Sequence, residues 1–290
     1  MTSTVQGQVR RSWPLRNRAI RRFVANPSSI VGLALVMIFV LVAIFAPQLA
    51  PHSPASANFL AVRQAPSTEH LLGTDEIGRD VLSRVLHGAR VSLMAGVIAV
   101  LIALVLGVPL GLVSGYYGGR LDELIMRFTD ALLAFPFLIL AVAFTAALGP
   151  SLLNAMIAIG IASAPTFIRL TRGQVLAVRA EDYVQSAKAL GAGDLRILTH
   201  HVLPNSLAPI LVQATLTIAG AIIAESSLSF LGLGVQPPTP SWGGMLNTAQ
   251  GFIVQAPWMA VWPGLSIFVT VLAFNLFGDG LRDALDPRES

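Results

Sequence analysis

The sequence predicts an all-α polytopic membrane protein with six transmembrane helices. Hydrophobic residues make up 54% of its 290 residues and charged residues only 12%, about half the charged share of an ordinary soluble domain. The apolar residues also gather in runs of about 20, the length at which an α-helix crosses a bilayer core. The absence of cysteine excludes disulfides and thiolate metal sites, and the five histidines form no HExxH zinc motif.

Six apolar runs are long enough to span the membrane, and only residues 149–151 separate the third run from the fourth. This short connection predicts a tight helical hairpin. Pro136, Pro165 and Pro209 fall inside or at the edge of spans, where we expect each to kink a helix or to start one. The predicted spans are Ile30–Leu49, Val91–Val113, Phe128–Leu148, Leu152–Leu170, Ser206–Leu231 and Trp258–Phe277.

The distribution of lysine and arginine predicts the orientation of the spans. Fifteen of the 19 basic residues fall on the side that carries both ends of the chain, and four fall on the other side. The positive-inside rule places the first side in the cytoplasm. The fifteen are Arg10, Arg11, Arg16, Arg18, Arg21, Arg22, Arg120, Arg127, Arg169, Arg172, Arg179, Lys188, Arg196, Arg282 and Arg288, and the four are Arg63, Arg79, Arg84 and Arg90.

These boundaries divide the chain into five parts. A basic cytoplasmic tail (1–29) precedes the first transmembrane helix (30–49), and an external connection with a short helix follows (50–90). A core of five spans (91–280) contains a cytoplasmic loop at 173–205, and a second cytoplasmic tail covers 281–290.

The first span also has features of a secretory signal peptide, because arginines precede it and small residues lie around Ala46 and Ala50. Its run of roughly 17–20 apolar residues is long for the apolar region of a signal peptide, so we expect an uncleaved span. The basic tail would also suit a lipid surface or a nucleic-acid arm, but the orientation of the spans already accounts for its arginines. We expect contact with membrane lipid and none with nucleic acid.

The external connection carries ordered-looking sequence before the second span. Thr74 or Asp75 is expected to cap a short interfacial helix in which Asp80 and Arg84 form an i,i+4 pair. Asp75, Glu76 and Asp80 offer carboxylates to a cation, but their spacing does not match a calcium loop, so we expect no metal there.

The second external segment, residues 232–257, contains Pro237, Pro238 and Pro240, which forbid a regular helix. Trp242 and Trp258 suit the membrane interface. Two interpretations remain open at this stage: a rigid lid over a pathway mouth, or a simple solvated turn region.

Small and ionisable residues inside the spans predict internal contacts. Gly107, Gly111 and Gly115 recur every four residues, which predicts close packing of that face against another helix of this chain or of a partner. Glu225 lies within the fifth span, where a carboxylate should face protein or water rather than lipid. Glu225 and Ser226 are candidates for a translocation pathway, although a hydrogen-bonded structural role for Glu225 is the stronger expectation.

The cytoplasmic run 181–204, EDYVQSAKALGAGDLRILTHHVLP, is too polar for lipid and reads as two short helices. Glu181 and Asp182 place negative charge at the start of the first helix, and Gly191 ends it. Asp194 is expected to cap the second helix. Tyr183, Ala187 and Leu190 form a narrow apolar stripe on the first helix, while Lys188 and Arg196 add positive charge. From spacing alone this helix either docks into a partner's groove or lies on lipid headgroups.

The same run resembles the EAA loop of bacterial type I ABC-transporter permeases. That pattern reads Glu-Ala-Ala, three residues, Gly, nine residues, Ile-x-Leu-Pro. Gln185 and Ser186 stand where the pattern has Glu-Ala, and His201 stands where it has Ile. The matching positions are Ala187, Gly191, Leu203 and Pro204.

Further runs resemble the second, C-type permease subunit of the dipeptide/oligopeptide/nickel import family. They are LLGTDEIGRDVLSRVLHGARVSL (71–93), GYYGGRLDELIMR (115–127), AESSLSFLGLGVQPPTPSWGGML (224–246) and FNLFGDGLRDALDPR (274–288). The resemblance implies a type I importer fold in the bacterial inner membrane, which works with a second permease of B type, two cytoplasmic ATPases and an external substrate-binding protein. In the family the EAA loop is the helix that couples to the ATPase, and this implies coupling residues Glu181, Tyr183, Ala187, Lys188, Leu190, Gly191, Arg196 and Pro204.

The chain has no P-loop of its own, because its single lysine, Lys188, is flanked by alanines rather than by the Gly and Ser/Thr of that motif. ATP and Mg²⁺ are therefore expected on the partner ATPases, with no cofactor and no catalytic residue in this chain. The resemblance implies import of di- or oligopeptides, glutathione-like compounds or nickel chelates. Alternatives are a passive channel or scaffold subunit, and an intramembrane hydrolase using serines beside Glu225, for which histidine, lysine and metal partners are missing.

Overall fold

The computed structural model describes residues 15–285, and within that range the regular elements are all helical. The predicted all-α polytopic class is confirmed. Arg10, Arg11 and Arg288, which contribute to the predicted orientation, lie outside the described residues. The elements are α1 (Leu15–Ala25), α2 (Pro27–Leu49), α3 (Val81–Tyr117), α4 (Gly119–Leu133), α5 (Phe137–Leu148), α6 (Leu152–Val178), α7 (Asp182–Ala189), α8 (Asp194–Ile197), η1 (Leu198–Val202), α9 (Leu203–Phe230), α10 (Trp242–Ala249), η2 (Gln250–Phe252) and α11 (Trp258–Leu285).

Five helical stretches of the described chain are long and apolar enough to cross a membrane, and the bent pair α4 and α5 brings the number to six. The third predicted span, Phe128–Leu148, is wrong as a single helix, since α4 and α5 meet at 94°. Pro136 lies at the break and begins α5, as expected of a residue that lacks an N–H and disfavours helical geometry in the residue before it. Pro165 and Pro209 lie inside α6 and α9.

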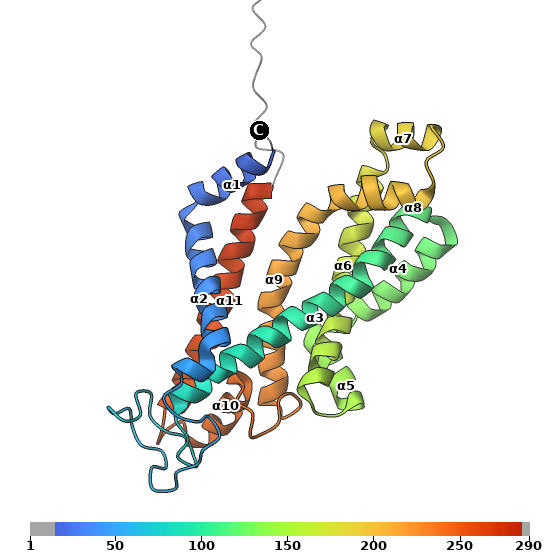
Figure 1. Cartoon of the computed structure of the whole chain (residues 1–290). Helices are drawn as coiled ribbons and strands as arrows, with labels where there is room; N and C mark the ends of the chain where they lie inside the picture. Colours follow the sequence, from blue (N-terminus) through green and yellow to red (C-terminus); the bar gives the residue numbers. More distant parts are fainter. Residues whose placement is uncertain (1–14, 286–290) are drawn as a thin grey trace, which may run out of the picture.

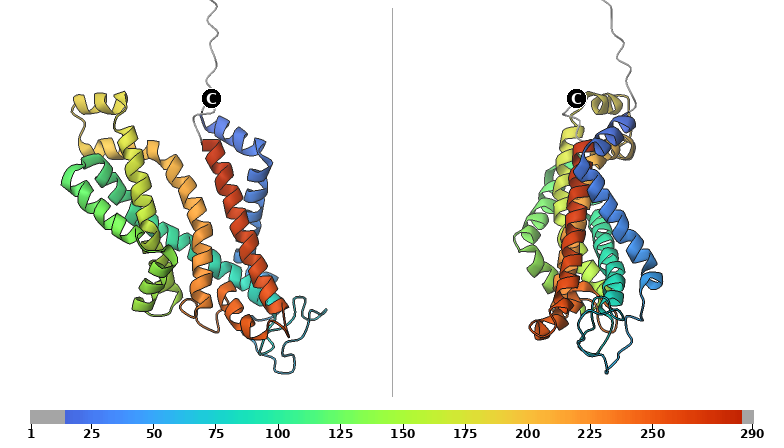
Figure 2. Two further views of the ribbon diagram at one scale, coloured as in Figure 1. Left: turned by 180° about the vertical axis from the view of Figure 1, so that it is seen from behind. Right: turned by 90° about the vertical axis from the view of Figure 1, so that its left-hand side faces the viewer.

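The long helix α3 runs obliquely through the molecule (Figure 1). It contacts α2, α9 and α10 as well as α4 and α6. At its start it packs with α2, α9 and α10 around the fully buried Trp242. Further along it packs against α6, with α5 and α9 completing a second apolar core. The views in Figure 2 agree that α2 and α11 lie side by side, away from α4 to α6.

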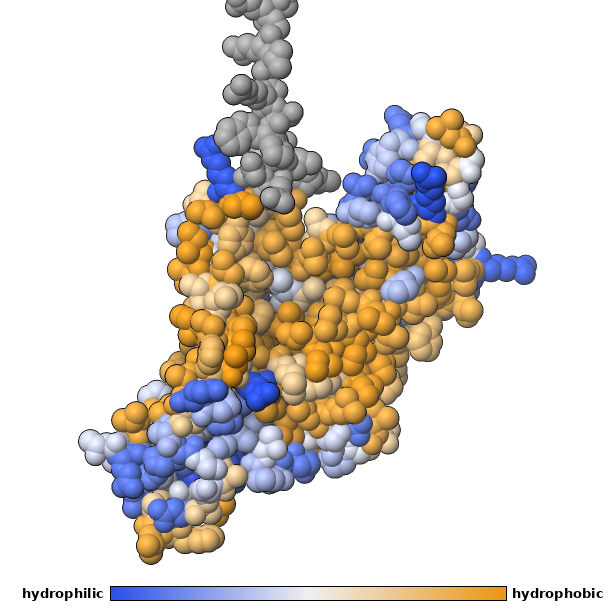
Figure 3. All heavy atoms as spheres, in the orientation of Figure 1, coloured by the Kyte–Doolittle hydropathy of each residue, from blue (hydrophilic) through white to orange (hydrophobic). Residues whose placement is uncertain are grey.

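The two ends of the molecule differ in structure. One end carries α1, the last turn of α11 and the projecting α7 and α8, whereas the other carries the long loop before α3 together with α10 (Figures 1 and 2). Between them lies a broad apolar surface, seen as a belt of hydrophobic residues in Figure 3. Exposed leucines, isoleucines and phenylalanines of α2, α5, α9 and α11 contribute to it, as expected of side chains that face lipid or a partner subunit.

The glycine stripe of α3 lies against α6 of the same chain. A Cβ atom added at Gly107 would lie 2.6 Å from the Cβ of Phe167, and one at Gly115 would lie 2.8 Å from the Cβ of Val175. Gly111 sits between them, facing Thr171. These distances are too short for any side chain, so glycine at every fourth position lets the two helices approach closely.

The short helix predicted within the external connection is not a separate element, because residues 50–80 fold as turns and residues 81–90 form the first turns of α3. Asp75 does not cap a helix, since its Oδ1 accepts hydrogen bonds from the backbone N–H groups of Ile77 and Arg79 and so closes a turn. Asp80 is the N-cap of α3 and accepts from the N–H of Ser83 at 2.8 Å. The predicted pair of Asp80 with Arg84 is also wrong, because Arg84 lies 3.4 Å from Asp75 instead.

Trp242 is buried inside the protein rather than exposed on its surface. Its ring is fully buried against α2, α3 and α9, and its Nε1 donates to the carbonyl of Val85 at 3.0 Å. Trp258 donates to the carbonyl of Thr74 at 3.1 Å. The two indoles thus tie the part of the chain after α9 to the start of α3 and to the loop before it, which gives this end of the molecule a folded structure.

We expect the alanine variant of Gly111 to lower the free energy of unfolding by about 1–3 kcal/mol, the usual cost of overpacking a tight contact. The new Cβ would lie 2.6 Å from the Cβ of Thr171 and 2.7 Å from the carbonyl oxygen of Ile168. Gly173→Ala in α6 is the matched control, because nothing lies within 4 Å of its added Cβ. Equilibrium unfolding in detergent measures both variants, and equal stability of the two would contradict the assignment.

Candidate functional site

The segment 179–204 projects from one end of the helical body and returns to it (Figure 1). It consists of α7, a turn at residues 190–193, the short α8 and the π-helical turn η1, which leads into α9. Gly191 has φ +83°, the left-handed conformation in which glycine ends a helix at little cost. Pro204 lies in the first turn of α9, where a missing N–H is tolerated.

A small apolar cluster fixes this segment to the helical body. Val184 of α7, Ile197 of α8 and Val202 of η1 are buried against Val175 at the end of α6. The partly buried Tyr116 and Leu112 of α3 complete the contact. The stripe named from sequence did not include Val184, which faces the body from another side of the same short helix.

Polar contacts reinforce the attachment at the end of α3. The Tyr116 hydroxyl donates to Asp194 Oδ1 at 2.7 Å, so Asp194 binds a side chain instead of capping α8 as predicted. Arg179 donates to the carbonyl oxygens of Gly115 and Tyr116, both at 2.9 Å. Gln185 Nε2 in turn donates to the carbonyl of Arg179 at 2.8 Å. The last turn of α3 is therefore linked directly to α8 through Asp194, and to α7 through Arg179 and Gln185.

The outer surface of the same segment is apolar at several positions. The exposed fractions are 88% for Leu190, 75% for Leu195 and 45% for Tyr183, and hydrophobic atoms are visible at this tip in Figure 3. Ala187 is half-buried. Lys188, Arg196 and Glu181 are exposed around these residues. An apolar surface rimmed by charges is typical of a contact site for another protein.

A bidentate ion pair joins the neighbouring helices below this segment. Arg172 of α6 donates to both carboxylate oxygens of Asp122 in α4, at 2.6 and 2.7 Å, and the Ser114 hydroxyl of α3 donates to the same carboxylate. Arg169 pairs with Asp130 at 2.6 Å. Sequence reasoning missed both pairs, because their members lie 39 and 50 residues apart along the chain.

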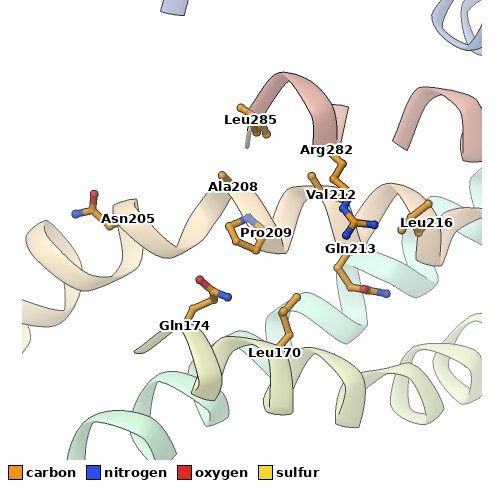
Figure 4. Close-up of a pocket in the computed structure, with 10 residues that line it drawn as sticks. All are labelled: Leu170, Gln174, Asn205, Ala208, Pro209, Val212, Gln213, Leu216, Arg282 and Leu285. Carbon is orange, nitrogen blue, oxygen red and sulfur yellow. The ribbon is translucent and has the colours of Figure 1, made fainter. Parts of the chain in front are cut away.

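A cavity of about 590 Å³ opens between α6, α9 and α11, at the end of the molecule that carries α7 (Figure 4). Its polar residues come from three elements: Gln174 from α6, Asn205 and Gln213 from α9, and Arg282 from α11. In Figure 4, Arg282 extends from α11 toward Gln213 of α9, while Gln174 lies across from α9 on α6. Leucines, Pro209 and Val212 form the remaining wall. The arrangement offers amide donors and acceptors and one positive charge to a polar guest.

Glu225 lies in the packing between α3 and α9. Its side chain is fully buried and accepts hydrogen bonds from the hydroxyls of Ser92 at 2.9 Å and Ser229 at 2.7 Å. This geometry favours the hydrogen-bonded structural role. Ser226, also buried, borders a second cavity of about 390 Å³ between α5, α9, α10 and α11.

Comparison with family models gives two matches that together cover most of the chain. Residues 107–290 match the binding-protein-dependent transport system inner membrane component. Residues 15–66 match the N-terminal transmembrane domain of oligopeptide transport permease C.

Curated relatives are similar over nearly the whole length. The dipeptide transport system permease protein DppC of Alkalihalophilus pseudofirmus is 51% identical, with 93% of this chain and 89% of that protein covered. The di/tripeptide permease DppC of Pseudomonas aeruginosa is 48% identical, at 92% and 90% coverage. The glutathione transport system permease protein GsiD of Escherichia coli is 48% identical, at 97% and 92% coverage.

Among solved structures, an inward-facing MetNI methionine ABC transporter matches with a TM-score of 0.57 at 18% identity. The match covers 70% of this chain and 97% of that chain. At this identity the likeness concerns the fold, which is that of the transmembrane subunit of an ABC importer.

We expect the leucine variant of Glu225 to lower the free energy of unfolding by about 1–3 kcal/mol, because it leaves the hydroxyls of Ser92 and Ser229 without their buried acceptor. Glu225→Gln keeps an oxygen and adds a donor at the same place, so it should retain most of the stability. Equilibrium unfolding in detergent compares the two with the wild type. A glutamine variant as unstable as the leucine variant would contradict this account.

Proposed function

Because the chain belongs to the family of binding-protein-dependent transport system inner membrane components, we propose that it forms one half of the membrane pathway of an ATP-driven peptide importer. The observation that carries the proposal is the segment 179–204, which combines an anchored inner face with an exposed apolar outer face. Such a segment transmits movement, since a force on its outer face reaches α3, α6 and α9 through Val184, Tyr116 and Arg179.

We infer that the outer face binds a partner ATPase on the cytoplasmic side. The sequence supports this placement, because most of the basic residues fall on the side of this segment. Leu190, Leu195 and Tyr183 offer apolar anchors of the kind that fill a groove on another protein. ATP and Mg²⁺ are bound by that partner, since this chain lacks a P-loop, and the chain itself is non-catalytic.

The proposed importer has two further protein partners. A second permease of B type completes the pathway, and an external binding protein delivers the substrate to the end that carries the loop 50–80 and α10. Both termini lie in the cytoplasm, and the chain crosses the inner membrane several times. On the wide apolar surface of α2, α5, α9 and α11 we expect contacts both with lipid and with the second permease.

The proposed cargo is a dipeptide, an oligopeptide or a related small solute such as glutathione. Support comes from the peptide and glutathione permeases that are 48–51% identical to this chain. The cavity that contains Gln174, Gln213 and Arg282 is consistent with such cargo, because amide groups and one guanidinium suit peptide bonds and a terminal carboxylate. We therefore place the pathway along this cavity rather than at Glu225.

The coupling role predicts a specific defect. In proteoliposomes that contain the whole transporter and its binding protein, Ala187→Asp should keep ATP hydrolysis while peptide uptake falls at least about tenfold, because a charge in the apolar face weakens the contact. Replacing Gly191 with a bulky residue should act alike, since a side chain at φ +83° strains the turn. Both variants should still insert in the membrane.

Two matched controls accompany these variants. Gly193 has φ −69° and nothing within 4 Å of an added Cβ, so Gly193→Ala should transport normally. Ala189→Asp places the same charge on another side of α7 and should have a smaller effect. Wild-type uptake per ATP hydrolysed by Ala187→Asp would exclude the coupling role and leave the family assignment intact.

A further inference from the structure

Two histidines and an aspartate lie close together at the external end of the molecule. This end is far from the segment 179–204 and from the cavity between α6, α9 and α11. His52 follows α2, His70 lies in the loop, and Asp80 caps the start of α3. The side chains of His70 and Asp80 are buried, with exposed fractions of 7% and 1%, while that of His52 is 40% exposed. His70 and Asp80 are therefore held in place by the surrounding protein, while the cluster is open to solvent at His52.

The atoms that face one another are ligand atoms. Asp80 Oδ1 lies 3.0 Å from His70 Nδ1 and 3.8 Å from His52 Nδ1. The three residues each offer one ligand atom within 4.8 Å of the other two. Tetrahedral ligands at about 2.0–2.2 Å from a zinc ion lie about 3.3–3.6 Å apart, so the observed spacing needs only small shifts to hold a metal.

A serine holds the cluster from behind. The hydroxyl of Ser83 donates to Asp80 Oδ2 at 2.7 Å and accepts from the backbone N–H of His52 at 3.1 Å. Asp80 Oδ2 also accepts from the N–H of Ser83, which leaves Oδ1 directed at the imidazoles. Outer contacts of this kind orient the ligands of metal sites.

The two neighbouring arginines form their ion pairs with other acidic residues and not with Asp80. Arg79 and Arg84 both approach Asp75, and Arg79 also contacts Glu76. The acidic residues beside the cluster are thus committed to the two arginines, and the Asp80 carboxylate has only imidazoles and its own helix end as partners among the described contacts.

We propose that His52, His70 and Asp80 form a binding site for a divalent transition metal of the zinc type, with a fourth position open to water or to a ligand of an approaching molecule. Two imidazoles and one carboxylate suit zinc, nickel and copper better than calcium or magnesium. Because His52 lies at the end of α2 and Asp80 at the start of α3, a bound metal would fasten the external loop to both helices. The proposal does not depend on the transported substrate.

The test uses the full chain in detergent, purified with a tag that contains no histidine and freed of metal by a chelator. Titration with ZnCl₂, followed by equilibrium dialysis and metal analysis, should give one Zn²⁺ per chain. His52→Gln removes a ligand without touching the helix cap, and it should weaken binding at least about tenfold. Ser83→Ala should weaken it about 10- to 100-fold, as loss of an outer contact does.

His200→Gln is the matched control, because His200 is exposed in the distant cytoplasmic segment, and it should bind zinc like the wild type. Replacing Zn²⁺ by Co²⁺ adds a second readout, since the visible spectrum of Co²⁺ reports nitrogen and oxygen ligands and should change in His52→Gln. Failure of the wild type to bind zinc stoichiometrically, or equal affinity of the wild type and His52→Gln, would overturn the proposal.

Discussion

The close contact between α3 and α6 is the interaction on which the rest of the structure depends. Helices in lipid gain no hydrophobic energy from association, so they need tight packing and internal polar contacts. Gly107, Gly111 and Gly115 provide the tight packing, and the ion pair of Arg172 with Asp122 adds a polar contact near the end that carries α7. The ends of both helices then form the base to which the segment 179–204 is attached.

The same contact gives the segment 179–204 a firm attachment to the helical body. The buried Val184 and Ile197, together with the hydrogen bond from Tyr116 to Asp194, bind α7 and α8 to the ends of α3 and α6. At its other end, the segment continues through η1 into α9 without an intervening loop. Displacement of the segment would therefore act on α9 and on the α3–α6 pair together, beside the cavity between α6, α9 and α11.

The fold could be predicted from sequence to the extent that a local pattern determines it. Apolar runs located the spans, Pro136 marked the break in the third, and Gly191 marked the end of α7. Burial and pairing across long separations could not be predicted. Tryptophan is a residue type typical of membrane interfaces, and nothing local indicates that Trp242 packs on α3. Nothing local indicates either that Asp194 accepts a hydrogen bond from Tyr116. The cavity was missed because isolated glutamines in apolar helices give no periodic signal.

The polar groups inside the helical body fall into two classes with different physical roles. Glu225 is fully buried and hydrogen-bonded to serines of α3 and α9, so it resists separation of these helices. Gln174, Gln213 and Arg282 instead border open space, where water or a guest completes their hydrogen bonds. Helices joined by groups of the first kind should move together. Surfaces lined by the second kind can separate at smaller cost, so we expect relative movement at the cavity between α6, α9 and α11 rather than at Glu225.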